Sequence, residues 1–284
     1  MPLAALLLVL GAALCHSAWN LLVKTDARRL EIQSGALIVG VLLCSPVLLI
    51  YSLADVSRLA WGVILLSGLF ETAYVFALTA AYGAGDLSLV YPVARGTPPI
   101  FVVPLAIMLL GERPPWQGLA GIGLIVLGIY ASHAGLAGSR VGRVNRRALA
   151  LALLTGVFTA CYSLVNKLGV SLVPVPLYAF LVFGVDAALI HLVRWVRGGL
   201  TLPLGRDAPW GRTVAVGVLM MAAYLAVLAA MAMAPVSYVV AAREVSIVVT
   251  AVLGVLVLRE RHSATRIAGA AVIFAGLVVI ALAR

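Results

Sequence analysis

Long apolar runs separated by short polar stretches follow one another along the whole chain. A hydrocarbon core about 30 Å thick needs roughly 20 apolar residues in helical form to cross it. Backbone hydrogen bonds must close internally in lipid, so runs of this length are helices rather than barrel strands. The pattern predicts an all-α polytopic membrane protein with ten transmembrane helices, at residues 2–23, 32–54, 58–82, 87–110, 115–136, 147–168, 175–196, 210–233, 236–258 and 265–283.

The composition agrees with lipid as the surrounding solvent. Of the 284 residues, 64% are hydrophobic and 11% are charged, whereas soluble domains average about 45–50% and 25%. A soluble fold of this composition would have to coat its exterior with apolar side chains. The first run lacks the basic start and the small-residue cleavage site of a signal peptide, so we expect it to be a span. Three cysteines inside apolar runs are expected to pack as small residues rather than form disulfides: Cys15, Cys44 and Cys161.

The second half of the chain repeats the first. A shift of 148 residues pairs Arg95 with Arg243, Glu112 with Glu260, Arg113 with Arg261, Gly121 with Gly269 and Gly128 with Gly276. We therefore expect one five-helix repeat at 1–137, a basic linker at 138–147 and a second repeat at 148–284. Five is an odd number, so tandem copies must enter the membrane in opposite senses. Inverted repeats around a midplane site are the architecture of secondary transporters.

We attribute the net charge of +10 to basic loops that set the membrane topology, rather than to binding of a nucleic acid. Eighteen of the 20 lysines and arginines lie between or beside the apolar runs. Fourteen of them fall on the side that holds the loops after the first, fifth, seventh and ninth runs, and four fall on the other side. The positive-inside rule then places both termini outside the cytoplasm.

Two arginines, Arg95 and Arg243, lie inside apolar runs at equivalent positions of the two repeats. An ionisable group inside lipid is costly and usually faces a cavity or a partner. One interpretation makes each arginine a structural clamp on a helix end or on a carboxylate. The other makes the two guanidinium groups line a central cavity and bind a polar or anionic ligand.

Three acids also break the apolar pattern, namely Glu71, Asp186 and Glu244. Glu71 and Asp186 have no acidic counterpart in the other repeat, so the repeat symmetry does not explain them. A carboxylate inside the membrane can carry a proton during coupled transport. A neutral acid or an ion pair that bonds neighbouring helices is the alternative explanation.

Two matched polar stripes run along the first and sixth helices. The first stripe is His16, Trp19, Asn20 and Lys24, and the second is Thr159, Tyr162, Ser163 and Lys167. Their spacing puts each stripe on one helix face, and matched stripes favour the lining of a cavity over packing alone.

Four prolines surround Arg95 in the run at 87–110, whereas the run at 236–258 has none. Proline removes a backbone donor, so we expect the first of these helices to be kinked or partly unwound near Arg95. The two halves are then expected to differ in mobility. Glu112 with Arg113, and Glu260 with Arg261, lie at helix ends, where a solvated or loop-locking role is expected.

No enzymatic motif is found: the chain has no HExxH, GxSxG or Walker sequence and no Cys/His cluster with metal-ligand spacing. We therefore expect no enzyme, no cofactor, no metal and no direct use of ATP.

These features resemble the EamA family of the drug/metabolite transporter superfamily. The resemblance is carried by HSAWNLLVK (16–24), GDLSLVYPVARG (85–96), LGERPPWQGLAGIGLIVLGI (110–129) and the segment 242–280. It implies a secondary transporter with a central cavity between the halves, and both termini in the cytoplasm, against the charge count. By position, it implies cavity residues at His16, Trp19, Asn20, Tyr74, Tyr91, Arg95, Tyr162, Tyr224 and Arg243.

The sequence thus predicts an exporter or exchanger of a small polar or amphiphilic metabolite, working by alternating access. Glu71, Asp186 and Glu244 are the candidates for proton coupling. A proton-coupled exporter of lipophilic cations is the first alternative, with an acid inside an aromatic cage. A membrane assembly protein or intramembrane enzyme without transport is the second. The expected partners are a small solute and membrane lipids, without nucleic acid. The expected setting is a bacterial cytoplasmic membrane, as a monomer or homodimer.

Overall fold

A computed structural model of the chain describes residues 1–24, 26–85, 87–137, 145–199, 202, 207–249 and 264–283. All of the regular secondary structure in these residues is helical. The first half holds α1 (Leu3–Lys24), α2 (Arg29–Cys44), α3 (Arg58–Ala84), α4 (Leu87–Leu110) and α5 (Trp116–Ala137). The second half holds α6 (Arg146–Leu172), α7 (Val175–Val196), α8 (Trp210–Met233), α9 (Val236–Arg243) and α11 (Ala264–Leu282).

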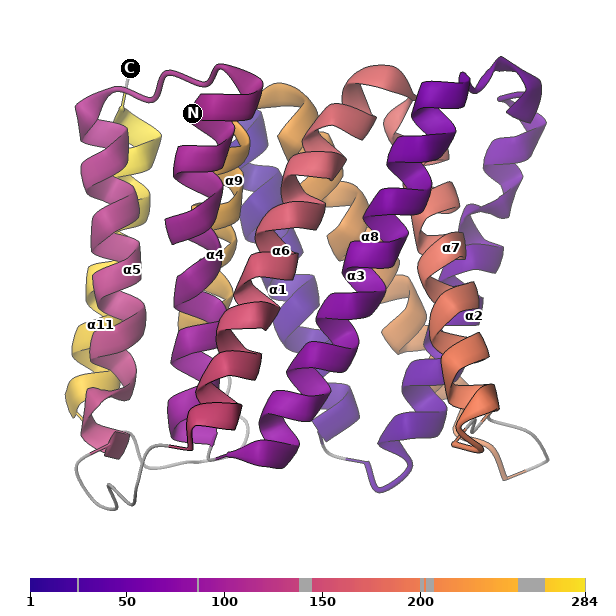
Figure 1. The fold of residues 1–284 in the computed structure, drawn as a ribbon, viewed down its shortest axis with the longest axis horizontal. Helices are drawn as coiled ribbons and strands as arrows, with labels where there is room; N and C mark the ends of the chain where they lie inside the picture. Colours follow the sequence, from indigo (N-terminus) through magenta and orange to yellow (C-terminus); the bar gives the residue numbers. More distant parts are fainter. Residues whose placement is uncertain are drawn as a thin grey trace.

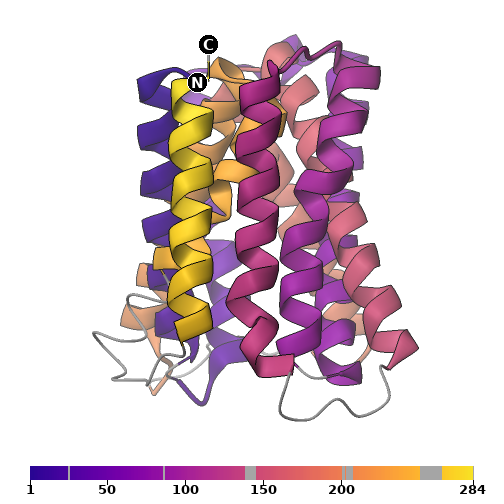
Figure 2. The same ribbon diagram turned by 90° about the vertical axis from the view of Figure 1, so that its left-hand side faces the viewer.

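The helices stand side by side as one bundle, and both termini lie at the same end of it (Figures 1 and 2). Within the described residues, seven helices are long and apolar enough to cross a membrane, and α5 and α11 contain shorter apolar stretches. These observations make the chain a multi-pass integral membrane protein. Most of the expected spans match the observed helices to within a few residues.

One expected span is shorter in the structure, which has an apolar span at Leu30–Leu49, and another is interrupted by a turn. The run at 32–54 is not one helix, because α2 ends at Cys44 and gives way to 3₁₀ turns at Ser45–Leu49 and Leu53–Asp55. Pro46, in the first turn after α2, cannot donate the backbone hydrogen bond that would continue it. In the run at 236–258, α9 stops at Arg243, Glu244 forms a turn, and residues 245–249 are helical again. The remainder of this run lies outside the described residues, as do Glu260, Arg261 and most of the expected linker.

The expected unwinding of the helix around Arg95 is also wrong. α4 is helical from Leu87 to Leu110, with Pro92, Pro98, Pro99 and Pro104 inside it. Proline in a membrane helix is tolerated where neighbouring helices and local adjustments satisfy the freed backbone groups. The interruption falls instead in the segment without proline, at Glu244.

Contacts between the halves follow the repeat. The pair α3 and α6 corresponds to α8 and α1, and the pair α2 and α8 corresponds to α7 and α3; all four pairs are in contact. α5 packs against its own equivalent α11 (Figures 1 and 2). There Gly121 lies against the backbone of Gly276, and Gly128 lies against that of Gly269. Gly121 corresponds to Gly269 in the repeat, and Gly128 corresponds to Gly276. The two contacts are therefore equivalent and are related by a pseudo-twofold axis.

The bundle has an apolar exterior and a polar interior. Large apolar side chains such as Leu49 and Met108 are exposed, whereas the carboxylates of Glu71, Asp186 and Glu244 are buried. Contiguous apolar surface on this scale suits contact with lipid. The interior acids need partners within the bundle.

Candidate functional site

Arg95 lies in the interior of the bundle, about two turns from the start of α4. Its Nη2 donates to Nε2 of His16 on α1 at 3.0 Å, and its Nη1 lies 3.6 Å from Oε1 of Glu244. The guanidinium also lies 5.9 Å from the centre of the Tyr91 ring, one turn earlier on α4. A guanidinium can only donate, so Nε2 of His16 accepts and this histidine is neutral with its proton on Nδ1.

Arg243 occupies the last position of α9, where a cation is favoured by the carboxyl end of the helix dipole. It interacts with the Tyr162 hydroxyl, with Glu244 and with the like charge of Arg95. The Tyr162 ring meets the Tyr74 ring edge-on, with 5.8 Å between their centres. α1, α3, α4, α6 and α9 thus bring the two arginines and their partners into one cluster.

The charges of this cluster do not balance. Arg95 and Arg243 are both cationic, and Glu244 is the one carboxylate that interacts with both among the described residues. Oε2 of Glu244 is buried without a hydrogen-bond partner in the described structure. The Arg95 side chain keeps 21% of its exposure although helices surround it. The cluster therefore holds two cations and one carboxylate, which is an excess of one positive charge.

Glu71 lies in a second polar cluster, held by α3, α6, α7 and α8. Its Oε1 accepts from Nδ2 of Asn166 at 3.0 Å and from the Tyr224 hydroxyl at 2.8 Å. The amide oxygen of Asn166 accepts in turn from Ser67 at 2.5 Å and from the Tyr178 hydroxyl at 2.9 Å. The Asn166 amide thus joins Glu71 to two further hydroxyl groups deep in the bundle.

Asp186 on α7 extends this cluster. Its Oδ1 accepts from the hydroxyl of Thr72, the neighbour of Glu71, at 2.8 Å. Asp186 also interacts electrostatically with Glu71 and with Arg194, two turns further along α7. Arg194 in turn donates to the Ser34 hydroxyl at 2.5 Å. A polar path therefore runs along α7 from Glu71 toward the end of the bundle opposite the termini.

The structure distributes the expected cavity residues and the three proton-coupling candidates over two clusters. The arginine cluster contains His16, Tyr74, Tyr91, Arg95, Tyr162, Arg243 and Glu244, and the carboxylate cluster contains Glu71, Asp186 and Tyr224. Trp19 packs edge-on against the His16 ring at 5.1 Å, and the Asn20 amide donates to the His16 carbonyl in its own helix. Sequence reasoning missed Asn166, Ser67, Thr72 and Tyr178. An amide inside an apolar run was the signal that could have found Asn166.

Lys167 and Glu112 hold the turn between α8 and α9. Nζ of Lys167 donates to the carbonyls of Met231 and Ala234 at 2.5 and 3.0 Å, at the carboxyl end of α8. The Glu112 carboxylate accepts from the backbone of Val236 at 2.5 Å and from the hydroxyl of Ser237 at 2.6 Å, at the amino end of α9. The loop-locking role expected of Glu112 agrees with these contacts, whereas Lys167 lies apart from the arginines.

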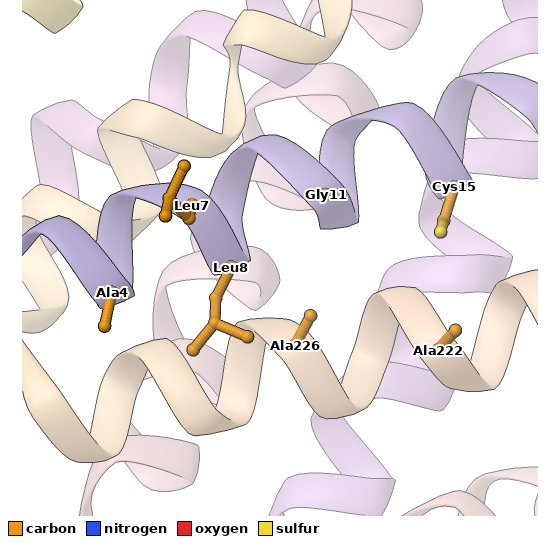
Figure 3. Close-up of a pocket in the computed structure, with 7 residues that line it drawn as sticks. All are labelled: Ala4, Leu7, Leu8, Gly11, Cys15, Ala222 and Ala226. Carbon is orange, nitrogen blue, oxygen red and sulfur yellow. The ribbon is translucent and has the colours of Figure 1, made fainter.

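Two open grooves on the described structure lie outside both clusters. One, of about 490 Å³, runs between α1 and α8, where Leu8 and Cys15 point toward Ala226 and Ala222 (Figure 3). The other, of about 290 Å³, runs between α4 and α5. Neither is lined by a charged residue. Among the described residues, no group of three or more His, Cys, Asp or Glu could hold a metal ion.

Comparison of the sequence with protein families gives one assignment. The model of the EamA-like transporter family matches residues 3–132 and again residues 146–282. The chain belongs to the EamA-like transporter family. The two matches make it a two-repeat EamA protein of the drug/metabolite transporter type, a class of transporters rather than enzymes. No curated protein sequence matches the chain significantly.

A solved structure supports the fold of this EamA protein. A crystal structure of another protein, 21% identical in sequence, superposes with a TM-score of 0.78. The match covers 100% of this chain and 99% of that chain. At this level of identity the likeness concerns the fold alone.

Proposed function

We propose that this EamA protein is a secondary transporter of a small solute that carries a negative group. The observation on which the proposal rests is the arginine pair, Arg95 and Arg243, with one shared carboxylate. A carboxylate or phosphate-type group accepts paired hydrogen bonds from guanidinium, and its charge would balance the cluster. The aromatic rings of Tyr74, Tyr91 and Tyr162 would pack against an amphiphilic body.

Ten spans in two inverted repeats would supply alternating access. α1 begins at the end of the bundle that holds the termini, whereas its equivalent α6 begins at the opposite end (Figure 1). Rocking of one repeat against the other about the arginine cluster would expose the solute to each side in turn. The loops at the opposite end carry most of the basic residues, which supports placing the termini outside a bacterial cytoplasmic membrane.

A lipophilic cation is less well supported as the solute. Glu71 and Asp186, which would bind it, already accept hydrogen bonds from Asn166, Tyr224 and Thr72. A cation would have to displace these donors, whereas an anion would meet side chains that donate hydrogen bonds.

Transport by purified protein in liposomes tests the proposal. A thermal-shift screen over metabolites identifies solutes that bind the native state, and uptake of each is then measured for wild type, Arg95→Lys and Arg243→Lys. Loss of paired hydrogen bonds should reduce uptake of anions at least tenfold in both variants. Arg212→Lys is the matched control, because Arg212 pairs with Asp26 in a salt bridge outside both clusters. Normal transport by both variants, or binding of cations alone, would contradict the proposal.

A further inference from the structure

Resting on the proposed function, we propose that Glu71 binds one proton together with each anion, so that anion and proton cross the membrane as an electroneutral pair. The observation behind this is the position of a buried acid beside the unbalanced arginine cluster. Asn166 and Tyr224 donate to the Glu71 carboxylate, and Asp186 is the neighbouring acid.

Four elements present a polar or charged group to Glu71. Asn166 comes from α6 and Tyr224 from α8, and both donate to Oε1. Asp186 from α7 and Arg243 from α9 interact with it electrostatically. On its own helix α3, Ser67 also interacts with the carboxylate. Within the described residues, no lysine or arginine nitrogen lies within 4.0 Å of it.

The other basic groups nearby have different partners. Lys167, adjacent to Asn166, is bound to the carbonyls at the end of α8. His16 faces Arg95 and accepts from it. Arg194 interacts electrostatically with Asp186 from two turns further along the same helix, and Thr72 donates to the Asp186 carboxylate. Asp186 accepts one hydrogen bond, whereas Glu71 accepts two and also interacts with Arg243 of the arginine cluster. Glu71 is therefore the acid whose protonation responds to the charge of that cluster.

A count of charges gives the sign of the coupling between anion binding and protonation of Glu71. With Glu71 and Asp186 both protonated, the residues Arg95, Arg243 and Glu244 sum to one positive charge. The interior becomes neutral either when Glu71 loses its proton or when an anion binds. A bound anion and an ionised Glu71 would together leave an excess negative charge in a medium of low dielectric constant, which is costly.

Anion binding and protonation of Glu71 therefore favour each other, and this preference is reciprocal. The pair crosses as one anion and one proton, with no net charge moved. A cation transporter with the same acids would show the opposite sign, because cation and proton would compete. The sign of the coupling thus separates the two kinds of transport.

Infrared titration of the full-length protein in nanodiscs tests the coupling without any ligand. Protonated carboxylic acids give a distinct carbonyl-stretch band, and the part of this band that disappears in Glu71→Gln reports Glu71. Arg243→Gln removes the positive charge that an anion would neutralise, so the midpoint of the Glu71 band should move to higher pH. Arg243→Lys, which keeps the charge, should keep the wild-type midpoint, and so should the distant Arg212→Gln.

A second measurement uses a ligand and the unmodified protein. Benzoate is an aromatic carboxylate that stays ionised between about pH 6 and 8, and benzamide is its neutral counterpart. Benzoate should bind roughly fivefold or more tightly at pH 6 than at pH 8, with proton uptake in a weakly buffered solution. Glu71→Gln should bind benzoate without pH dependence and without proton uptake, and benzamide should show neither effect.

The outcomes separate this inference from the proposed function. Benzoate binding without pH dependence and without proton uptake would overturn the coupling and leave the anion site standing. A Glu71 midpoint that is identical in wild type and Arg243→Gln would overturn it without reference to any ligand. Loss of anion transport selectivity in the liposome assay, with the Glu71 midpoint shifted as expected, would overturn the proposed solute and leave the electrostatic link standing.

Discussion

Arg95 of the first repeat lies 3.6 Å from Glu244 of the second, and Glu244 directly follows Arg243, the repeat equivalent of Arg95. One carboxylate therefore faces two arginines that the repeat relates to each other. The break in the helix after Arg243 makes this possible, because it places the carboxylate at a turn rather than within a continuous helix. The two repeats are thus joined by an electrostatic contact between α4 and the turn after α9.

Glu244→Gln should destabilise the protein without ligand and increase its dependence on anions. The change leaves two half-buried cations without their carboxylate, at an expected cost of about 1–3 kcal/mol. The thermal unfolding midpoint of the variant should fall, and benzoate should raise it by more than it does in wild type. Equal midpoints for the two proteins would show that Glu244 does not balance the arginines.

His16→Leu should weaken anion binding, whereas His16→Gln should preserve most of it. The His16 ring accepts a hydrogen bond from Arg95 at 3.0 Å and so fixes the direction of the guanidinium. Loss of the acceptor should cost about 1–3 kcal/mol, and a glutamine carbonyl can replace the acceptor. Binding measured by calorimetry checks this order, and Trp19→Phe serves as the control because it keeps an aromatic ring beside residue 16. Equal affinities for His16→Leu and His16→Gln would contradict a positioning role for the histidine.

Much of the fold follows from the sequence because lipid imposes a simple rule. An apolar run of about 20 residues must be a helix, so the helices near 58–82, 87–110, 175–196 and 210–233 could be placed within a few residues. The alignment of the two repeats places Arg95 and Arg243 at equivalent positions, and the structure brings both into one cluster. Here hydrophobic pattern and repeat symmetry were sufficient.

Partner choice and helix breaks could not be predicted in this way. Pro98 and Pro99 lie inside an unbroken helix, whereas the turn at Glu244 has no proline to mark it. Tyr224 binds Glu71 rather than the arginines, because the packing of α8 against α6 decides which polar groups meet. Such contacts depend on the rotation of each helix about its axis, which the apolar pattern fixes only coarsely.

Glu112→Gln should lower stability by about 0.5–2 kcal/mol, the usual effect of weakening a cap at a helix start. The carboxylate accepts from the backbone of Val236 and Ser237 and from the Ser237 hydroxyl. A neutral amide keeps one acceptor but loses the charge that suits the amino end of α9. Urea unfolding in detergent measures the change, with Arg113→Gln as the control because the neighbouring arginine is exposed. A decrease of similar size in both variants would indicate a loop effect without capping.

Gly128→Ala should be one of the more damaging small substitutions in this chain, although it adds a single methyl group. A Cβ at this position would lie 2.7 Å from the backbone nitrogen of Ile273 and 2.8 Å from the carbonyl oxygen of Gly269. Backbone atoms cannot rotate away, so α5 and α11 would have to separate, at about 1–3 kcal/mol. Gly123→Ala on the same helix has nothing within 4 Å of the added carbon, and alanine favours helix formation over glycine by about 1 kcal/mol.

Thermal unfolding of the two variants and of wild type therefore separates the effect of helix packing from the effect of helix propensity. Gly128→Ala should unfold at a lower temperature, and Gly123→Ala at the wild-type temperature or above it. Gly269→Ala should behave like Gly128→Ala, because its added carbon would lie 2.4 Å from the backbone nitrogen of Ser132. If Gly128→Ala and Gly123→Ala were equally stable, the close approach of α5 and α11 would not hold in the folded protein. The pseudo-twofold axis would then need a different contact at this crossing.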